Sequence, residues 1–415
     1  MVAPKVYTVI MWRKTVGIML ICLGLVGMGA TAVLWQSGRL DVVKGVSVTN
    51  SPLTHPVIPL LQKPEAVDQS WTLLITGDII PARTVNWQMT LKNDFSWPLT
   101  NINDVLKYAD LTLINLEAPL LTNCPVTREG MRFCGDSRFA AALSDSGVDI
   151  ANLANNHTLN YGWEGLTETE GNLREVGIET TGFTALPREI QSSPLPLQAF
   201  LNPNNTTKYP ESNPSNSKQN LAYAKNCLKD ISCSRLTVKT LQFHSGQVGQ
   251  NLKIGFLGYN AVGQRIDREI VRSEIESADT LVDVLFVSVH WGKEYERYPA
   301  TDSIAQDDPR ELGKLFIEWG ADVIVGNHPH WYQPFDFAQG KDGGDKVIFY
   351  ALGNTVFDQE WSPETKVGYL TKLYFDGKNI IKDKLEIFPL GIRDYGQTYF
   401  LEGPEKETVL DLLQP

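Results

Sequence analysis

The sequence lacks the short motifs that mark the commonest nucleotide-binding and hydrolase chemistries. It contains no glycine-rich phosphate loop, no dinucleotide-binding fingerprint and no nucleophile elbow. Basic residues are also scarce, since 37 lysines and arginines face 48 aspartates and glutamates, which gives a net charge of −11. General nucleic-acid binding needs a basic surface to replace phosphate counterions, so we expect no nucleic-acid partner.

The net charge is unevenly distributed along the 415 residues. Residues 1–50 carry five basic residues and one acidic residue, so residues 51–415 hold a net charge of −15. Such an acidic body repels a polyanion unless a metal ion or a local basic patch receives it. With 42% hydrophobic and 20% charged residues, the composition is that of a folded protein with one large domain or two ordinary ones.

Residues 16–35 form a nearly continuous apolar run without a charged side chain, about the length of helix that crosses a bilayer. Arg13 and Lys14 precede it, so the positive-inside rule places residues 1–15 in the cytoplasm and the rest outside. The alternative is a cleaved signal peptide, because Ala30-Thr31-Ala32 resembles a cleavage site. An anchor is the better interpretation because the apolar run continues past that site. We expect a single-pass cell-membrane protein whose body is extracytoplasmic.

Composition divides the rest of the chain. Residues 36–70 are rich in Pro, Ser, Thr and Val without amphipathic period, which predicts an extracytoplasmic linker. Residues 71–395 form the predicted folded domain, and residues 396–415 are expected to be a C-terminal tail. Within the domain, residues 187–249 are crowded with Asn, Ser, Pro and Gln, which predicts a long low-complexity surface insertion.

Four of the five cysteines lie in two close pairs. Cys22 falls inside the apolar run, whereas Cys124 and Cys134 form one pair and Cys227 and Cys233 the other. In an exported protein this pattern predicts two local disulfides. A zinc site built from the four cysteines is the alternative, but their spacing suits it poorly.

The domain alternates apolar strands with helical segments, which predicts an α/β fold. The clearest helix signal is residues 308–319, where Asp308 caps, Pro309 takes the first position and Glu311 completes a capping box. The expected strand cores are residues 72–76, 111–114, 148–153, 252–257, 282–289 and 347–352.

Polar side chains follow the strands, and four of the six histidines lie at such positions. The clearest case is the apolar run 321–325, which ends at Gly326 and is followed by His328 and His330, with Pro329 stiffening the backbone between them. Ligands of α/β proteins sit beyond the carboxyl ends of strands, and imidazole is the commonest transition-metal ligand. The alternative is a polar turn that merely contains histidine.

The strand ends together offer carboxylates, an amide and imidazoles, a mixed N/O set suited to borderline divalent metals such as Mn, Fe or Zn. Two such ions, about 3.5–4 Å apart, would share a bridging ligand. The candidate metal ligands are Asp78, Glu117, Asn156, His290, His328 and His330.

Six short motifs occur in order along the chain: Gly77-Asp78, Asn115-Leu116-Glu117, Ala154-Asn155-Asn156-His157, His290-Trp291-Gly292, Gly326-Asn327-His328-Pro329-His330 and Tyr350-Ala351-Leu352-Gly353-Asn354. Their order resembles the bacterial CapA family of capsule and poly-γ-glutamate synthesis proteins, over about residues 71–395. That resemblance implies a calcineurin-like metallophosphatase fold, a sandwich of sheets flanked by helices.

The resemblance also implies roles for individual residues. Asp78 and His330 are expected to bind metal one, and Glu117 to bridge both ions. Asn156 is expected to bind metal two, where His290 and His328 serve as further ligands, and His157 to protonate the leaving group. The sequence departs from the phosphatase pattern at two points. Asp78-Ile79-Ile80 lacks the histidine of the Asp-x-His opening, and a glutamate replaces the bridging aspartate.

Four residues near these ligands complete the expected substrate site. Arg83 can receive an anionic group as a fork-shaped donor, although a surface salt bridge explains it equally well. Trp291 follows His290 and is a candidate for the pocket wall, although a packed core position is the better interpretation. Asn155 and Asn354 lie within the matching motifs, and Asp358 is expected to be solvated.

The expected function is participation in making or attaching capsule or poly-γ-glutamate, with metal-assisted attack on a phosphoryl or γ-glutamyl centre and His157 as the acid. The expected partners are the bilayer, the anionic surface polymer or its precursor, and membrane synthase subunits. Two alternatives stay open: a non-catalytic polymer-binding subunit of a synthase, and a general exported metallophosphoesterase.

Overall fold

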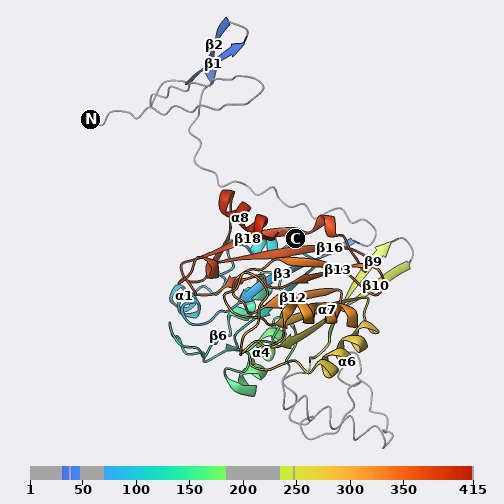
Figure 1. Cartoon of the computed structure of the whole chain (residues 1–415). Helices are drawn as coiled ribbons and strands as arrows, with labels where there is room; N and C mark the ends of the chain where they lie inside the picture. The colour runs from blue at the N-terminus through green and yellow to red at the C-terminus, as the bar shows by residue number, and fades with distance from the viewer. Residues whose placement is uncertain (1–29, 37–38, 47–69, 184–233, 246–247, 414–415) are drawn as a thin grey trace, which may run out of the picture. The chain divides into compact units, whose positions relative to one another are not determined.

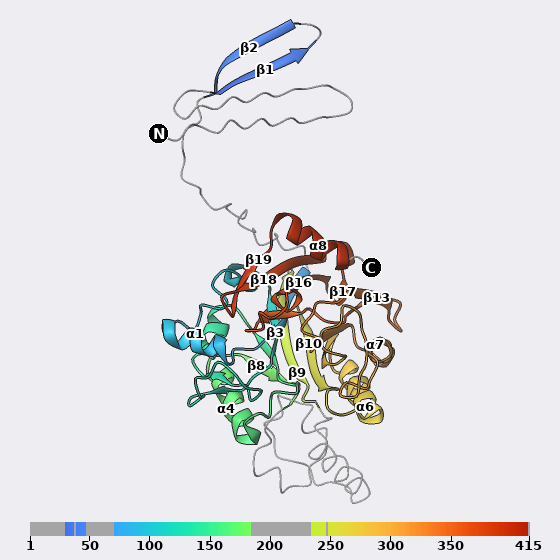
Figure 2. The same cartoon turned by 60° about the vertical axis from the view of Figure 1, so that its left-hand side comes forward.

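The computed structural model describes residues 30–36, 39–46, 70–183, 234–245 and 248–413 (Figures 1 and 2). It divides into two compact units, residues 1–62 and residues 63–415, which are described separately.

The first unit contains one antiparallel hairpin, β1 (Ala30–Gln36) with β2 (Arg39–Val46). Most of the expected membrane helix, residues 16–29, lies outside the described residues, as does Cys22. Residues 30–35, the last part of the expected helix, belong to strand β1 instead. Within the described part of the chain, no helix is both long enough and apolar enough to cross a membrane.

The second unit is a sandwich of two mixed sheets, which confirms the predicted α/β class. The six-stranded sheet runs, in spatial order, β13 (Phe335–Gln339), β14 (Asp345–Phe349), β12 (Val323–Asn327), β11 (Val284–His290), β10 (Val248–Asn260) and β9 (Thr237–Ser245). Its four central strands are parallel and both edge strands are antiparallel.

The nine-stranded sheet is also mixed, with parallel pairing from β3 to β8 and antiparallel pairing on the other side of β3. Its main path is β19 (Gln397–Phe400), β18 (Glu386–Arg393), β16 (Val367–Asp376), β3 (Ser70–Ile79), β4 (Leu111–Leu116), β7 (Ile150–Asn152) and β8 (Glu179–Thr181). Short strands β15 (Asn354–Val356) and β17 (Asn379–Ile380) pair with β3 and β16.

The main core lies between the two sheets, where inward residues of each strand alternate with outward ones. Trp71 of β3 stacks on Phe375 of β16 at 4.1 Å and meets the edge of Phe286 of β11 at 6.5 Å. These rings are fully buried, and each such side chain contributes about 1.5–3 kcal/mol through the apolar area it removes from water. The two sheets are therefore held face to face by a rigid aromatic layer.

Helices cover the outer faces of the sandwich (Figure 2). The outer face of the six-stranded sheet packs against α6 (Arg268–Asp279) and α7 (Pro309–Trp319) through a second apolar cluster. The nine-stranded sheet is accompanied by α1 (Thr84–Lys92), α2 (Asn103–Lys107), α3 (Phe139–Asp145) and α4 (Gly162–Glu175), and α8 (Gly403–Leu413) contacts β18.

All six expected strand cores overlap observed strands. Helix α7 begins as predicted, because the Asp308 carboxylate accepts hydrogen bonds from the backbone N–H groups of Arg310 and Glu311. The predicted capping box is wrong in its second half. The Glu311 carboxylate instead pairs with both terminal nitrogens of Arg268, at 2.8 and 3.0 Å.

Two expected domain boundaries are also wrong. Residues 237–245 and 248–249 were assigned to the insertion, yet they form β9 and the start of β10, because their apolar residues complete the edge of a sheet. Residues 397–413 are not a tail, since β19 extends the nine-stranded sheet and Val409 and Leu413 of α8 are buried in the main core. Residues 184–233, which include Cys227 and Cys233, lie outside the described residues.

Candidate metal centre

The carboxyl ends of parallel strands from both sheets meet at one place, as the sequence predicts. Asp78 lies near the end of β3 and Glu117 directly follows β4, while His290 ends β11 and His328 directly follows β12. The His328 N–H donates to Asp78 Oδ2 at 3.3 Å, and His290 Nε2 lies 3.4 Å from Glu117 Oε1. Each of these contacts joins the two sheets across the sandwich.

Two overlapping groups of buried side chains have donor atoms close enough to share a metal ion. One group is Glu117, His328 and His330, and the other is Asp78, Glu117 and His290. In each group one ligand atom per residue lies within 4.8 Å of the others. Glu117 belongs to both groups, which is the position that a bridging carboxylate occupies between two ions.

Glu117 is fully buried, and neither of its carboxylate oxygens accepts a hydrogen bond in the described structure. Burial, together with the nearby Asp78 carboxylate, raises the pKa of Glu117 well above its usual value. A buried carboxylate without partners is costly, because the lost hydration is not replaced. A divalent cation would supply the missing partner, so the residues present fit a metal ion.

Burial and charge give the three histidines different protonation states. Burial lowers the pKa of His290 to about 4 and that of His328 well below its usual value, so both rings are neutral at pH 7. At His330 burial also acts downward, but the carboxylates of Asp78 and Glu117 outweigh it and raise the pKa to about 9. Neutral imidazole is the metal-binding form, so His290 and His328 are ready to bind and His330 must first lose a proton.

The turn that carries His328 and His330 holds both residues at positive φ, 97° and 57°. Seven residues other than glycine have positive φ in the described chain, and four of them surround this site. Each such residue costs on the order of 1–3 kcal/mol, and strain of this kind clusters at functional sites. The four are Arg83, Tyr295, His328 and His330.

His157 lies beside the metal-ligand candidates. Its neighbour Asn156 places Oδ1 3.1 Å from His290 Nε2. His157 Nδ1 lies 3.0 Å from Asn160 Oδ1, which also accepts the N–H of Phe133 at 2.6 Å. Because an amide oxygen only accepts, Nδ1 of His157 carries the proton and Nε2 is left with a lone pair. Burial lowers the pKa of His157 to about 4, so the ring is neutral at pH 7.

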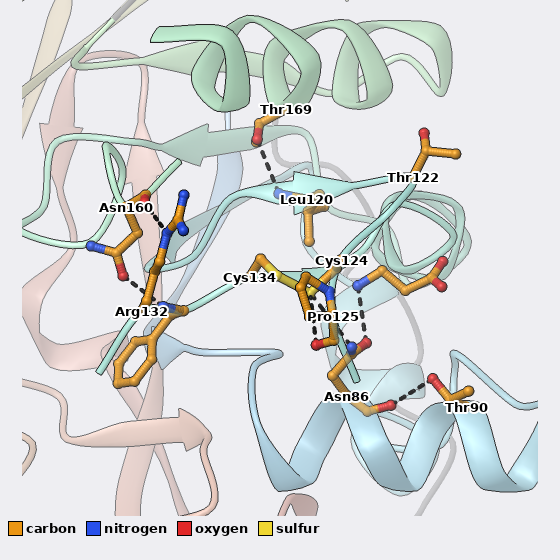
Figure 3. Close-up of a disulfide and its surroundings, with 12 residues drawn as sticks. Asn86, Thr90, Leu120, Thr122, Cys124, Pro125, Arg132, Cys134, Asn160 and Thr169 are labelled. Atoms are coloured by element: carbon orange, nitrogen blue, oxygen red, sulfur yellow. Dashed lines mark hydrogen bonds between the residues drawn. A yellow bond between two sulfur atoms is a disulfide. The ribbon is translucent and has the colours of Figure 1, made fainter. Parts of the chain in front are cut away.

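The predicted disulfide between Cys124 and Cys134 is present (Figure 3). It closes a loop whose Phe133 stacks on the His157 ring at 4.0 Å. Asn160 accepts hydrogen bonds from this loop through both of its oxygens, the backbone O and Oδ1. The disulfide loop therefore fixes the ring plane of His157.

Comparisons with known proteins agree with the residue pattern. The profile of the family described as "Bacterial capsule synthesis protein PGA_cap" matches residues 72–359, more than half of the chain. The chain belongs to this family. It is 26% identical to a capsule biosynthesis protein CapA of Bacillus anthracis, over 87% of this chain and 81% of that protein. It is 25% identical to a PGA biosynthesis protein CapA of Bacillus subtilis, over 77% and 70%. A solved structure of a hypothetical protein from Thermus thermophilus has a TM-score of 0.37 and 14% identity, over 79% of this chain and 99% of that chain.

In this member of the capsule synthesis family, an asparagine network beneath the ligands was not predicted. Asn115 donates to Asp78 Oδ1 at 2.8 Å, and Asn152 donates to Asn115 Oδ1 at 3.0 Å. The role of Asn115 could have been predicted from the sequence. Asn115 lies two residues before Glu117, so an extended chain points both side chains to the same face. The sequence gives no local signal for the role of Asn152. Its side chain fits because Gly258 of the facing sheet has no side chain, and a Cβ at Gly258 would lie 2.1 Å from Asn152 Oδ1.

Three of the four expected substrate-binding residues have structural roles instead. Asn155 is buried, and its Nδ2 donates to the Leu116 carbonyl at 2.9 Å. Trp291 is fully buried in the core under α7 and donates to the Tyr350 carbonyl at 2.9 Å. Asn354 accepts from His330 Nδ1 at 2.9 Å and so orients that ring. The polar side-chain atoms of these three residues have hydrogen-bond partners within the protein.

Arg83, the fourth, lies close to His157 but is already paired. Its guanidinium forms an ion pair with the buried carboxylate of Asp358, which was expected to be solvated. The same guanidinium lies over the rings of Phe133 and Phe357, at 4.8 and 4.9 Å. Arg83 therefore forms a salt bridge, but with a buried partner and not on the surface as the alternative had it, and its charge is largely neutralised.

Proposed function

We propose that this chain is a membrane-anchored, extracytoplasmic protein of capsule or poly-γ-glutamate biosynthesis, with a divalent-metal site that acts at a phosphoryl or γ-glutamyl centre. The observation that carries the proposal is the carboxylate of Glu117. It is fully buried, without a hydrogen-bond donor, among Asp78 and three imidazoles. An apolar residue would be cheaper at this position unless a cation is bound there.

The ligands would be Asp78 and His290 in one group, with Asn156 beside His290, and His328 and His330 in the other, with Glu117 shared between them. Carboxylate, amide and imidazole together suit Mn²⁺, Fe²⁺ or Zn²⁺. When bound, such an ion supplies Lewis-acid polarisation of a phosphoryl or acyl oxygen and lowers the pKa of water. Asn115 and Asn354 hold Asp78 and His330 in their orientations through the hydrogen bonds described above.

His157 is the proposed proton carrier. Asn160 fixes the proton on Nδ1, so Nε2 is the atom that takes up a proton and later gives it to the leaving group. The stacked ring of Phe133 covers one face of the imidazole and keeps water from it. Because His157 is neutral at pH 7, it can deliver a proton as an acid only after it has first accepted one.

The names of the relatives support the biological setting of the proposal. One is described as a capsule biosynthesis protein and another as a PGA biosynthesis protein. The acidic body implies that an anionic polymer is received at a local cationic site, which a bound metal ion would provide. The partners proposed are therefore the surface polymer or its precursor and the membrane enzymes that synthesise it.

The membrane anchor is proposed from sequence, because residues 16–35 are apolar and follow Arg13 and Lys14. Protease added to intact protoplasts should digest the body of the protein. Complete protection of the body would contradict an extracytoplasmic location.

Two substitutions separate the enzyme from its alternatives. His157→Ala should leave metal binding nearly intact and slow turnover about 100- to 10,000-fold, the usual contribution of general acid–base catalysis. His328→Ala should lose both metal binding and turnover. The substrates are a phosphoester series and γ-glutamyl peptides, assayed beside polymer production in cells.

Each alternative predicts a different result. A non-catalytic polymer-binding subunit would sustain polymer production with His157→Ala and would lose it when residues 16–35 are removed. A general phosphoesterase would hydrolyse phosphoesters and leave polymer production unchanged when the gene is deleted.

A further inference from the structure

Arg132, on the disulfide loop, presents its guanidinium in a fixed orientation at the protein surface. Its Nε donates to the Asn160 carbonyl at 2.8 Å, and the guanidinium lies 3.9 Å above the ring of Tyr161 (Figure 3 shows Arg132 and Asn160). Stacking and the Nε hydrogen bond fix the plane of the group, while its terminal nitrogens keep their donor hydrogens. The guanidinium is therefore held in one orientation while its terminal N–H groups can still donate to a ligand.

Arg132 forms no ion pair with a carboxylate among the described residues, whereas Arg138 and Arg83 do. Arg138 is held by both oxygens of Asp136, and Arg83 by Asp358. Arg128, also on the disulfide loop, lies 4.8 Å over the Trp87 ring and likewise forms no ion pair with a described residue. Against an acidic body, the loop carries two guanidiniums without an ion pair among the described residues and a single carboxylate, that of Glu129, so its net charge is positive.

The same loop reaches the proposed reaction site. Arg132 and His157 both bind Asn160, one at the backbone oxygen and the other at Oδ1. Phe133, the next residue, stacks on His157. Asn160 and Phe133 therefore connect the Arg132 side chain and its loop to the imidazole of His157.

Exposed apolar side chains accompany the two arginines. Met131 is 71% exposed and Val126 is 49% exposed, both within the disulfide loop. A chain of γ-linked glutamate alternates a free α-carboxylate with two methylene groups in each unit. Guanidiniums match the carboxylates and the apolar side chains match the methylenes.

We propose that the loop closed by Cys124 and Cys134 is a polymer-binding subsite, in which Arg132, assisted by Arg128, binds the α-carboxylates of γ-linked polyglutamate and presents the chain to His157. This inference rests on the proposed function and specifies its substrate class. In this proposal the disulfide loop binds the polymer, and the metal ligands have no part in that binding.

The test is direct binding of a fluorescent γ-linked glutamate decamer to the full chain in detergent, followed by anisotropy at about 0.1 M salt with EDTA present. Arg132→Gln should weaken binding about tenfold, since hydrogen bonds to a charged group are the strong ones. Arg132→Lys should give an intermediate loss because it keeps the charge without the fork. Arg138→Gln is the matched control and should bind as the wild type, because Arg138 is already neutralised by Asp136.

Several outcomes would overturn the proposal. Equal binding by wild type and Arg132→Gln would do so, as would equal losses in Arg132→Gln and Arg138→Gln, which would indicate non-specific charge attraction. An anionic polysaccharide that binds more tightly than the decamer through Arg132 would replace the proposed ligand. Because EDTA is present, failure of the metal proposal leaves this measurement unaffected, and a null result here leaves metal binding to be judged separately.

Discussion

The substitution Gly258→Ala is predicted to weaken metal binding from the opposite sheet, without touching any ligand. The added methyl group would lie 2.1 Å from Asn152 Oδ1 and 3.0 Å from Gly182 Cα. Asn152 must therefore move, which breaks its hydrogen bond to Asn115 Oδ1. Asn115 is then free to turn away from Asp78, whose Oδ1 it binds at 2.8 Å.

The structure gives separate magnitudes for stability and for binding. Overpacking of a tight interior costs about 1–3 kcal/mol, and one lost buried hydrogen bond adds about 1 kcal/mol. Loss of a residue that orients a metal ligand lowers affinity about 10- to 100-fold. We therefore expect a folded variant with a lower denaturation midpoint and clearly weaker metal binding.

The assay is urea denaturation of the metal-free protein together with metal titration of the same variant. Gly171→Ala is the matched control, because its added methyl group meets nothing within 4 Å and lies within helix α4, where alanine stabilises by about 0.5–1 kcal/mol. If Gly258→Ala fails to fold, Asn152→Ala removes the same hydrogen bond without a clash and should also weaken binding. Wild-type metal affinity in both variants would refute the proposed role of the asparagine network.

Two further predictions concern the disulfide and pH. Replacing both Cys124 and Cys134 with serine should lower the free energy of unfolding by about 2–3 kcal/mol, if the entropic model of loop closure holds; an unchanged urea midpoint would contradict it. Apparent metal affinity should rise about tenfold per pH unit up to about pH 9 and then level off, because metal binding requires loss of the proton that His330 holds below its raised pKa of about 9. A flat profile in metal titrations between pH 6 and 9 would show that His330 does not exchange a proton for the ion.

Local patterns in the sequence were sufficient to place the ligands at strand ends. Apolar runs predicted the strands, and the polar residues after them predicted where Asp78, Glu117, His290 and His328 meet. The Asp308 cap was also predictable, because it depends only on the next three residues. Each of these predictions depends only on residues that are neighbours in the sequence, so a single sequence is enough to make it.

The roles that sequence missed depend on partners far along the chain. Arg83 pairs with Asp358 across 275 residues, and Asn152 fits only because Gly258 lies opposite it in the other sheet. Trp291 was a candidate for the pocket wall because it follows a ligand in sequence, although a core position was the better interpretation. Successive strand residues point to opposite faces, so the neighbour of an inward ligand points outward, under α7.

The most direct test of the central claim is metal analysis of the purified full chain by mass spectrometry, before and after incubation with Mn²⁺, Fe²⁺ or Zn²⁺. The account predicts at least one divalent ion per wild-type chain and a sharp loss in Glu117→Gln, which removes the charge shared by both ligand groups. A wild-type chain that stays metal-free after every incubation would contradict it.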